Sequence, residues 1–359
     1  MNFKSVIPFL LMGTTLTPAG TSNATQPESK TDKSTKIYHQ PDQNTLNALF
    51  VLGDTTTIHN DVTDAYLDNK AENLRDIYVR NMLAAQAKLN PLLGKRGYSA
   101  AVRQELPGAP VGMHCVWGQH TQLARALAET GDTMTIIPDG ARTACVQFKS
   151  EMRKKYKPCE YTDCISEGVL YESRSDFLDA QKRFLVRNKV WANAPDSVKQ
   201  KTEQKFQQKN FCADDLNPGT ILIVPRYRGS KNLFHAIMYL GRGYVQDGKF
   251  VADANGRHIY TGHNRENIGD LFKAYDTSNV FAADIKNIAK AEYTKELERI
   301  KAMSDDELRR YLGEPVIYSL YPRKTLLNLA IAKYFNKDTD NNLYWWDAPL
   351  MAHAPQRQR

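Results

Sequence analysis

The spacing of apolar positions changes along the chain and predicts helices near both of its ends. From 61 to 89, apolar side chains recur at the three- and four-residue spacing of one helix face, and Pro91 ends the pattern. The same spacing returns from 284 to 335, where Gly313 and Pro315 interrupt it. We therefore expect a helical segment before the middle of the chain and a broken helical segment after it.

A further helix is predicted directly after a stiff turn. Two prolines and a glycine between 107 and 110 predict the turn, and no Gly or Pro occurs from 119 to 130. Leu123 and Leu127 share one helical face, and Gly131 is suited to cap the C terminus of this helix. We therefore expect Cys115 at the start of a helix.

Short runs of apolar and β-branched residues predict strands in the second half of the chain. These runs lie at 220–224, 234–240 and 250–254, and the turn-forming pairs Pro218-Gly219 and Asn255-Gly256 bound them. Together they predict a small antiparallel sheet behind the helix that carries Cys115. The fold class expected from this pattern is α+β.

The first 50 residues are predicted to hold an export signal followed by a flexible leader. Lys4 precedes a mostly apolar run at 6–16, which is shorter than the ~20 residues that a membrane-spanning helix needs. Ser22-Asn23-Ala24 provides a small-x-small cleavage site, and Pro18-Ala19-Gly20 provides an alternative one. We interpret 1–24 as a signal peptide and the polar stretch 25–50 as a leader, so that the protein is exported to the periplasm or secreted.

Composition restricts the classes of partner. The chain has 359 residues, 42% of them hydrophobic, and a formal net charge of +8. A basic surface favours anionic partners such as nucleic acid, membrane headgroups or an acidic cell-wall polymer. The basic residues are interspersed with acids and no nucleic-acid-binding motif is present, which argues against nucleic acid. No second long apolar run occurs, so we expect no integral membrane segment, and we expect a monomer.

Cysteine number and spacing single out one thiol. The chain has five cysteines: Cys115, Cys145, Cys159, Cys164 and Cys212. An odd number in an exported protein means that one thiol is free or pairs with another chain. The last four lie in one lysine-rich stretch. They could form two disulfides, in any of three connectivities, or alternatively bind zinc through all four thiolates. If the other four cysteines form two disulfides, Cys115 is the thiol that remains free.

Cys115 and His235 form a candidate catalytic pair. A helix N terminus offers a partial positive charge and free backbone N–H groups, which favour a thiolate and can hold an oxyanion. His235 begins a predicted strand, and an imidazole at that place can face a helix end. Such a histidine can deprotonate the thiol and later protonate the leaving amine.

Asp253 and Asn255 are the candidates for a third residue that orients the imidazole. If Leu240 pairs with Gly248 across a loop at 241–247, Asp253 lies directly opposite His235 on the same sheet face. Asn255 has the same parity along the strand. The pattern leaves open which of the two would accept the other imidazole N–H.

The remaining histidines near these positions are given lesser roles. His114 and His120 flank Cys115; shaping the pocket is one possible role for them, and local surface positions are the interpretation that we prefer. His258 and His263 have a four-residue interval, but Thr261-Gly262 between them argues against a helix that would align both rings on a metal. These two histidines therefore do not indicate a metal site, and we expect no cofactor.

Two segments resemble a known group of enzymes. The segment His235-Ala-Ile-Met-Tyr-Leu-Gly-Arg-Gly243 resembles the His-strand signature of NlpC-like cell-wall peptidases, and Leu216-Asn-Pro-Gly-Thr-Ile-Leu-Ile-Val224 resembles their Pro-Gly strand. The segments Cys115-Val-Trp117 and Asp253-Ala-Asn255 are similar to the CHAP branch of cysteine, histidine-dependent amidohydrolases/peptidases. The resemblance extends over about residues 105 to 265.

The resemblance implies a papain-like core, no metal, and hydrolysis of amide bonds in peptidoglycan peptides or at the glycan-peptide junction. We expect a catalytic domain at 101–285 with a cysteine-rich insertion at 140–215. The helical spacing adds a helical N-terminal segment at 51–100 and a helical C-terminal extension at 286–359, and the resemblance does not cover these flanks. Two other functions remain open. One is a secreted effector that cleaves or deamidates a protein, because the same chemistry serves any amide. The other is a non-catalytic cell-wall binding module.

Overall fold

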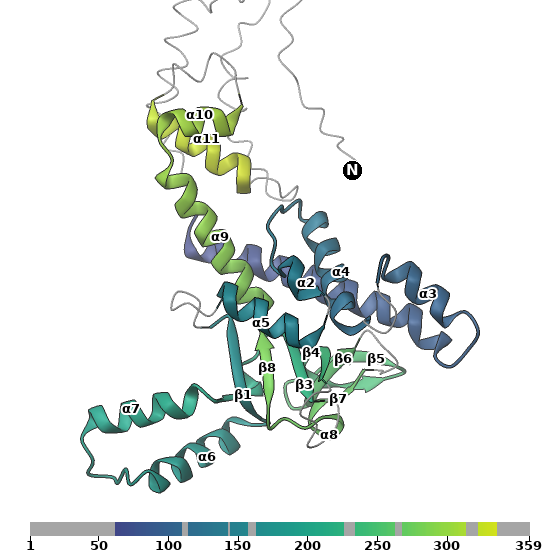
Figure 1. Ribbon diagram of the computed structural model, residues 1–359, viewed down its shortest axis with the longest axis vertical. Helices are drawn as coiled ribbons and strands as arrows, with labels where there is room; N and C mark the ends of the chain where they lie inside the picture. The colour runs from purple at the N-terminus through teal and green to yellow at the C-terminus, as the bar shows by residue number, and fades with distance from the viewer. Residues whose placement is uncertain are drawn as a thin grey trace, which may run out of the picture. The chain divides into compact units, whose positions relative to one another are not determined.

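The computed structural model describes residues 62–109, 114–142, 144–156, 163–225, 234–262, 268–313 and 322–335, all of which belong to one compact unit. The predicted signal peptide at 1–24, the leader at 25–50 and the aromatic C-terminal stretch lie outside the described residues. The described part is a mixed α+β structure in which helices pack on a sheet (Figure 1).

Eight strands of the described residues form one sheet, mostly antiparallel. Its order is β2-β1-β8-β3-β4-β6-β7, with β5 paired to the far half of β4. The strands are β1 (Ile165–Tyr171), β2 (Asn210–Cys212), β3 (Ile221–Pro225), β4 (Phe234–Gln246), β5 (Lys249–Ala252), β6 (Arg257–Gly262), β7 (Gly269–Asp270) and β8 (Val280–Ala283). The three predicted strands are therefore confirmed as β3, β4 and β5, within a larger sheet than expected.

The helices come from four stretches of the chain. They are α2 (Asp64–Leu89), α3 (Tyr98–Glu105), α4 (His114–Glu129), α5 (Cys145–Tyr156), α6 (Arg174–Arg187), α7 (Asp196–Gln207), α8 (Leu271–Ala274), α9 (Ile285–Ala302), α10 (Asp305–Leu312) and α11 (Arg323–Phe335). Short 3₁₀ turns occur at Asn90–Leu92, Asp139–Arg142 and Ala213–Asp215. The helices predicted from periodicity at 61–89 and 284–335 are confirmed, and the interruption in the second begins at Gly313, whose φ is +87°.

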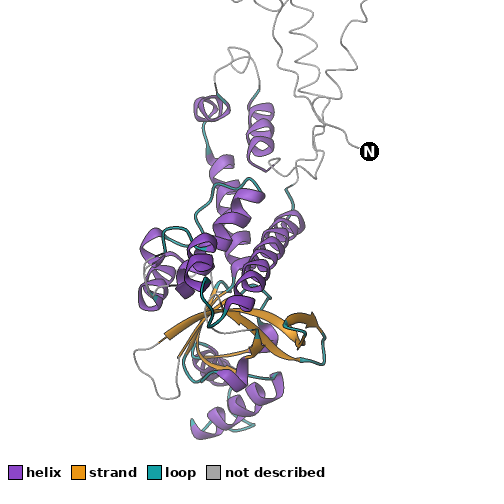
Figure 2. Cartoon of the chain, turned by 90° about the vertical axis from the view of Figure 1, so that its right-hand side faces the viewer, coloured by secondary structure: helices purple, strands orange, loops and turns teal. Residues whose placement is uncertain are grey.

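The two faces of the sheet pack against different helices. On one face Ile223, Ala236 and Met238 join the main core with α2, α4, α5 and α9. On the other face Val224 and Ile237 pack in a smaller core with α8. Figures 1 and 2 show helices on both sides of the strands, with α6 and α7 forming a hairpin beside β1 and β2. Successive apolar residues of β3 and β4 therefore point to opposite faces of the sheet, and both faces are buried.

The stretch at 140–215, which was predicted to be an insertion, contributes directly to the sheet and the core. β1 pairs antiparallel with β8, and Ile165 lies opposite Ala283. β2 pairs parallel with β1. The lysine-rich run in this stretch lies in the second half of α5. There Arg153 pairs with Glu167 of β1, and Lys155 pairs with Glu292 of α9.

The turn between β4 and β5 differs from the prediction. Instead of a loop at 241–247, β4 continues through Gly241 to Gln246, which pairs with Lys249. Asp247 and Gly248 form a two-residue turn with φ of 51° and 73°. Two positive φ angles in succession are typical of a tight type I′ hairpin turn, for which Asp-Gly is a favoured sequence. The predicted register, with Leu240 opposite Gly248, is wrong.

Candidate functional site

Cys115 is the second residue of α4, as the sequence predicted for a helix start. Its side chain is partly exposed at the edge of the main core. One turn later on the same face, Gln119 is buried and accepts a hydrogen bond from the Tyr78 hydroxyl of α2 at 2.5 Å. The first N–H groups of a helix have no acceptor within that helix, so the N terminus of α4 offers donors beside the thiol.

His235 is the second residue of β4 and pairs with Val224 of β3. Its side chain is buried, and α4 packs on β4 so that the imidazole is near enough to Cys115 to lower the pKa of that thiol. The Tyr275 ring lies on another side of the imidazole, with 6.2 Å between the ring centroids and 31° between the planes. The beginning of the His strand and the beginning of the Cys helix therefore meet, which brings together the two residues of the predicted pair.

The surroundings of Cys115 favour its thiolate. A hydrogen bond from Cys145, a hydrogen bond and positive charge from His235, and the backbone N–H of Ala236 hold the pKa of the Cys115 thiol well below its usual value, although burial opposes them. A thiolate next to an imidazolium is the reactive form of a cysteine nucleophile.

Cys145 is a member of this site that the sequence prediction missed. It is the first residue of α5 and is buried. Its hydrogen bond to Cys115, together with burial, raises the pKa of the Cys145 thiol. Cys145 therefore stays protonated and acts as the donor, while Cys115 carries the charge. The signal in the sequence was a run without Gly or Pro from 141 to 157, which predicts a helix with Cys145 near its start.

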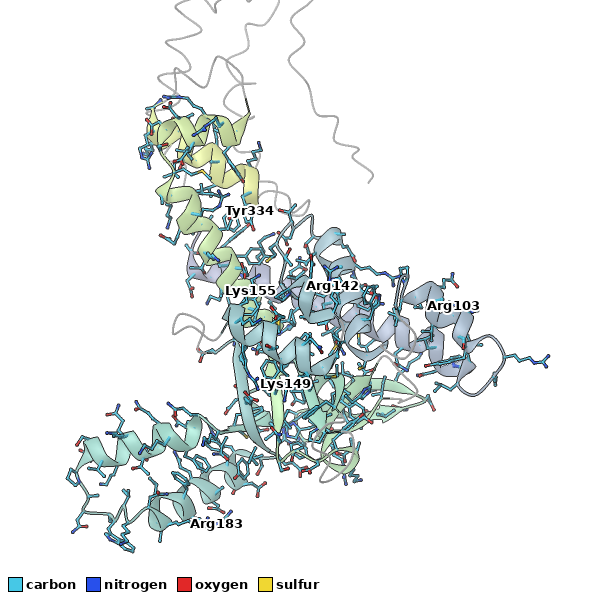
Figure 3. All side chains as sticks on the ribbon, viewed as in Figure 1. Arg103, Arg142, Lys149, Lys155, Arg183 and Tyr334 are labelled. Atoms are coloured by element: carbon cyan, nitrogen blue, oxygen red, sulfur yellow. The ribbon has the colours of Figure 1, made fainter. Side chains whose placement is uncertain are left out.

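Two further ionisable side chains lie on the helices that carry the thiols. Lys149, one turn after Cys145 on α5, places its ammonium 4.2 Å from the centroid of the Phe234 ring (Figure 3). Burial is the first cause of a lowered pKa for Lys149. On α4, burial and the nearby Arg142 lower the pKa of His120 to about 4, so His120 is neutral at pH 7. His120 also lies beside the Trp117 ring, at 6.2 Å between centroids, instead of at an open surface position.

The structure does not place Asp253 and Asn255 beside His235. The Asp253 backbone N–H donates to the carbonyl of Arg242, seven residues along β4 from His235, which is roughly 20 Å of extended strand. The Asp253 carboxylate accepts from the backbone N–H of Asn255 at 2.9 Å, and both side chains are exposed in the turn before β6. The register that would have placed Asp253 opposite His235 is the one that the tight Asp247-Gly248 turn rules out.

The described part of β6 ends before it reaches the level of His235. Gly262, its last residue, pairs with Ile237, two residues further along β4. None of the described residues of β5 and β6 is therefore the strand neighbour of His235. The ring of Tyr275 is a side-chain neighbour of His235. The buried hydroxyl of Tyr275 has no hydrogen-bond partner among the described residues.

The cysteines do not follow the predicted pairing. Cys115, Cys145, Cys164 and Cys212 are free thiols, and Cys159 lies outside the described residues. The prediction required two disulfides among the last four cysteines, and because three of these four are free, neither predicted disulfide is formed. Cys164 and Cys212 are buried, and burial raises the pKa of each. Their environments are those of structural thiols.

His258, which was considered as a metal ligand, lies in a separate polar cluster under the sheet. Its Nδ1 is 2.7 Å from the Tyr239 hydroxyl, and its Nε2 is 3.5 Å from a carboxylate oxygen of Asp214. Arg242 donates to the same carboxylate at 2.8 Å. Burial lowers the pKa of His258, so the ring is neutral at pH 7 and serves as a buried hydrogen-bonding group. His263 lies outside the described residues, within which no group of three metal-ligating side chains is found.

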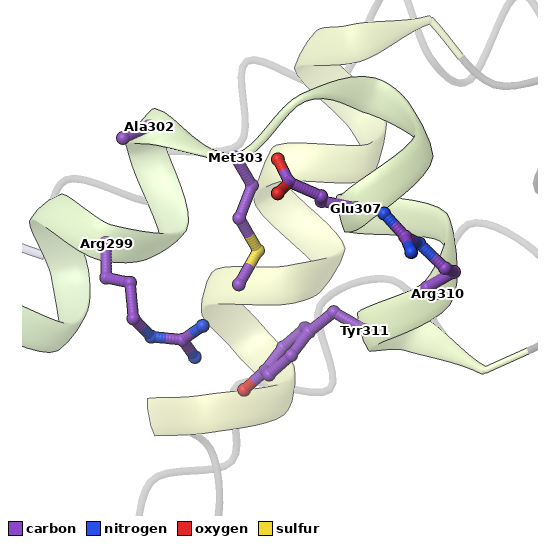
Figure 4. A pocket seen from close by; sticks show the side chains of 6 residues that line it. All are labelled: Arg299, Ala302, Met303, Glu307, Arg310 and Tyr311. Carbon is purple, nitrogen blue, oxygen red and sulfur yellow. The ribbon is translucent and has the colours of Figure 1, made fainter.

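Two hollows of the described surface lie away from Cys115 and His235. One is open to solvent where α9 meets α10, and Arg299, Met303 and Tyr311 line it (Figure 4). The other lies beside β1 and β2 and contains the Cys164 and Cys212 side chains. Neither brings a thiolate next to a base, so neither competes with the Cys115–His235 pair as a catalytic centre.

Comparison of the chain with known protein families, with curated proteins and with solved structures finds no match. In the part of the chain that the structure describes, no helix has the length and apolar character needed to cross a membrane.

Proposed function

We propose that this protein is a cysteine hydrolase of amide bonds, with Cys115 as the nucleophile and His235 as the general base. The observation that carries the proposal is the approach of Cys115, at the N terminus of α4, to the buried imidazole of His235 at the start of β4, whose influence lowers the pKa of the thiol. A nucleophile and a base in hydrogen-bond contact are the minimum for acyl transfer. An α+β structure with the Cys helix on an antiparallel sheet also supports the papain-like relationship.

The reaction follows from the charges of the pair. The Cys115 thiolate attacks the carbonyl carbon, and backbone N–H groups at the start of α4 stabilise the oxyanion. His235 transfers its proton to the nitrogen of the leaving amine, and the C–N bond breaks to leave a thioester on Cys115. Water then loses a proton to His235 and attacks the thioester, which releases a carboxylic acid and restores the thiolate–imidazolium pair.

Peptidoglycan peptides are the substrate class that we propose. The support is the likeness of the segments around His235 and Pro218 to NlpC-like cell-wall peptidases, the basic character of the chain and its predicted export signal. The enzyme would act in the periplasm or outside the cell, without a cofactor. Lys149, whose ammonium is half-buried close to the thiols, is suited to bind a carboxylate of such a peptide.

A Cys115→Ala variant tests the hydrolase proposal. Wild-type protein is expected to release peptides from purified sacculi, and the variant is expected to release none, with products followed by mass spectrometry. Cys164→Ala is the matched control, because it also removes a buried thiol but one remote from His235. Undiminished release by Cys115→Ala contradicts the proposal.

The same experiment separates the two other functions. If sacculi are not cut but Cys115 reacts rapidly with a thiol-directed electrophile at neutral pH, the second candidate, an effector that cleaves or deamidates a protein, is favoured. An inert Cys115 favours a non-catalytic cell-wall binding module.

A further inference from the structure

Two helices that pack on the same face of the sheet each carry a cysteine in their first turn. Cys115 is the second residue of α4 and Cys145 is the first residue of α5. Both helices contact β4, and Cys115 packs against the core to which Cys145 belongs. Lys149, one turn after Cys145, lies over the ring of Phe234 beside His235. The neighbouring Cys115 thiol, together with burial, raises the pKa of Cys145. Cys115 is partly exposed, whereas Cys145 is 8% exposed. A small peroxide therefore has better access to Cys115 than to Cys145.

We propose that Cys115 and Cys145 form an oxidation site, in which a peroxide oxidises Cys115 and Cys145 then closes an intramolecular disulfide with it. The disulfide would also stop amide hydrolysis, because it consumes the nucleophile; this consequence rests on the proposed function. Formation of the disulfide does not depend on any substrate and can be measured alone.

The first step needs a thiolate that a small oxidant can reach. The hydrogen bonds from His235 and from the Ala236 backbone keep Cys115 ionised. Its sulfur attacks one peroxide oxygen, an S–O bond forms, and the O–O bond breaks. The products are a sulfenic acid on Cys115 and, after protonation, water or an alcohol.

The second step uses a change of charge at Cys115. While Cys115 is an anion, its hydrogen bond and its charge raise the pKa of Cys145. A neutral sulfenic acid removes that charge, and the positive charge of Lys149, one turn along α5, continues to lower the pKa of Cys145. The Cys145 sulfur attacks the Cys115 sulfur, the S–O bond breaks, and hydroxide leaves with the Cys145 proton as water. Two thiols are oxidised and one peroxide is reduced.

The other described cysteines lack this arrangement. Cys212 is enclosed by aromatic side chains that include Phe177 and Phe206. Cys164 belongs to the main core, and burial followed by the charge of Asp284 raises its pKa to about 12. Neither has a thiolate neighbour, so peroxide is expected to select the Cys115–Cys145 pair.

Peptide mapping of the peroxide-treated full chain tests the proposal. The protein is incubated with hydrogen peroxide at neutral pH, alkylated with iodoacetamide without reductant, digested and analysed by mass spectrometry. We expect a peptide pair that is cross-linked through Cys115 and Cys145, and we expect dithiothreitol to restore alkylation of both. In Cys145→Ser we expect a sulfenic acid that dimedone traps and that proceeds to the sulfinic acid, so that dithiothreitol restores about tenfold less alkylation of Cys115.

The controls separate this proposal from the hydrolase proposal. Cys164→Ser is expected to form the same cross-link as the wild type, and the urea midpoint of Cys145→Ser checks that this variant is folded. Sulfinic Cys115 without a cross-link in the wild type, or a cross-link from Cys115 to a different cysteine, overturns the proposal. Failure to cut sacculi while the cross-link forms overturns only the hydrolase.

Discussion

At the scale of single residues, the charge state of Cys115 determines what the site can do. An ordinary thiol with a pKa of about 8.5 loses most of its reactivity below neutral pH, since only the thiolate is nucleophilic. Cys115 receives hydrogen bonds from Cys145, His235 and the Ala236 backbone, which lower its pKa. Its thiolate is therefore retained as the pH falls through the range in which an ordinary thiol becomes protonated.

The rate of Cys115 alkylation by iodoacetamide should reflect this lowered pKa. Between pH 8 and pH 6 the rate is expected to change little, whereas an ordinary thiol slows by about two orders of magnitude. His235→Ala removes the imidazolium and should reduce the rate at pH 6 by at least about tenfold. Cys164 is the internal control, because its pKa of about 12 should prevent labelling over the whole range. A wild-type rate that falls like that of an ordinary thiol contradicts the pair.

Substitutions at Asp253 and Asn255, unlike His235→Ala, are expected to change the reactivity of Cys115 very little. Both side chains are exposed at the turn before β6, where Asp253 contacts the backbone of Asn255. Asp253→Ala and Asn255→Ala should each change the alkylation rate of Cys115 and the release of peptide from sacculi by no more than about twofold, since neither touches the reacting pair. A loss comparable with that of His235→Ala would mean that one of them reaches the imidazole.

Residue patterns predicted the pair but not its neighbours, and the reason is physical. A cysteine after a turn and a histidine at the start of a strand are local signals, which periodicity and turn residues carry. The contact between Cys115 and Cys145 is set by how α4 and α5 pack on the sheet. Cysteine parity led to the wrong expectation for Cys145, because counting thiols assumes pairing that the free Cys145, Cys164 and Cys212 do not show.

At the scale of elements, helices and buried strands were easier to predict than strand register. α2 and α4 follow the predicted periodicity. Gly131, two residues after the end of α4, has a φ of +71°. The β4–β5 register was wrong because the turn residues Asp247 and Gly248 were placed inside a longer loop. A change of turn length moves every pair along both strands, so one misplaced turn was enough to misplace Asp253. β1 was missed because a glycine interrupts its apolar pattern.

That glycine, Gly168, permits the contact between β1 and the chain that enters β2. Its φ is +140°, and a Cβ added there would lie 1.9 Å from the carbonyl oxygen of Lys209. The same carbonyl accepts from the backbone N–H of Val169 at 2.9 Å. A side chain at 168 would therefore push apart the strands that this hydrogen bond joins.

Gly168→Ala should be markedly more destabilising than Gly94→Ala. Gly94 also has a positive φ, of +72°, but a Cβ there would meet nothing within 4 Å. Gly94→Ala is thus expected to cost only the backbone strain, about 1 kcal/mol, whereas Gly168→Ala adds a backbone clash and should cost at least about 3 kcal/mol. Urea unfolding of the two variants measures the difference. Equal midpoints would show that β1 and β2 can separate at this position without loss of stability.

At the scale of the whole molecule, a buried ionic cluster joins helices that are far apart in sequence. The Lys70 ammonium of α2 lies 3.4 Å from one carboxylate oxygen of Asp132, just after α4. The other carboxylate oxygen accepts from the hydroxyls of Thr130 at 2.7 Å and Tyr293 of α9 at 2.6 Å. The Tyr293 ring also lies 6.3 Å from the Phe335 ring of α11. This cluster therefore ties the C-terminal helices to the helix that positions Cys115.

Asp132→Ala should destabilise the whole unit, because it removes the carboxylate from a buried ammonium and from two hydroxyls. Breaking one side of a buried ion pair typically costs about 3–5 kcal/mol. The matched control is the double variant Lys70→Met with Asp132→Leu, which removes both charges and should recover a large part of that loss. Urea unfolding followed by circular dichroism measures the free energies, and alkylation of Cys115 at pH 6 reports whether α4 keeps its place. If Asp132→Ala unfolds at the wild-type urea midpoint, the cluster does not hold α2, α4 and α9 together.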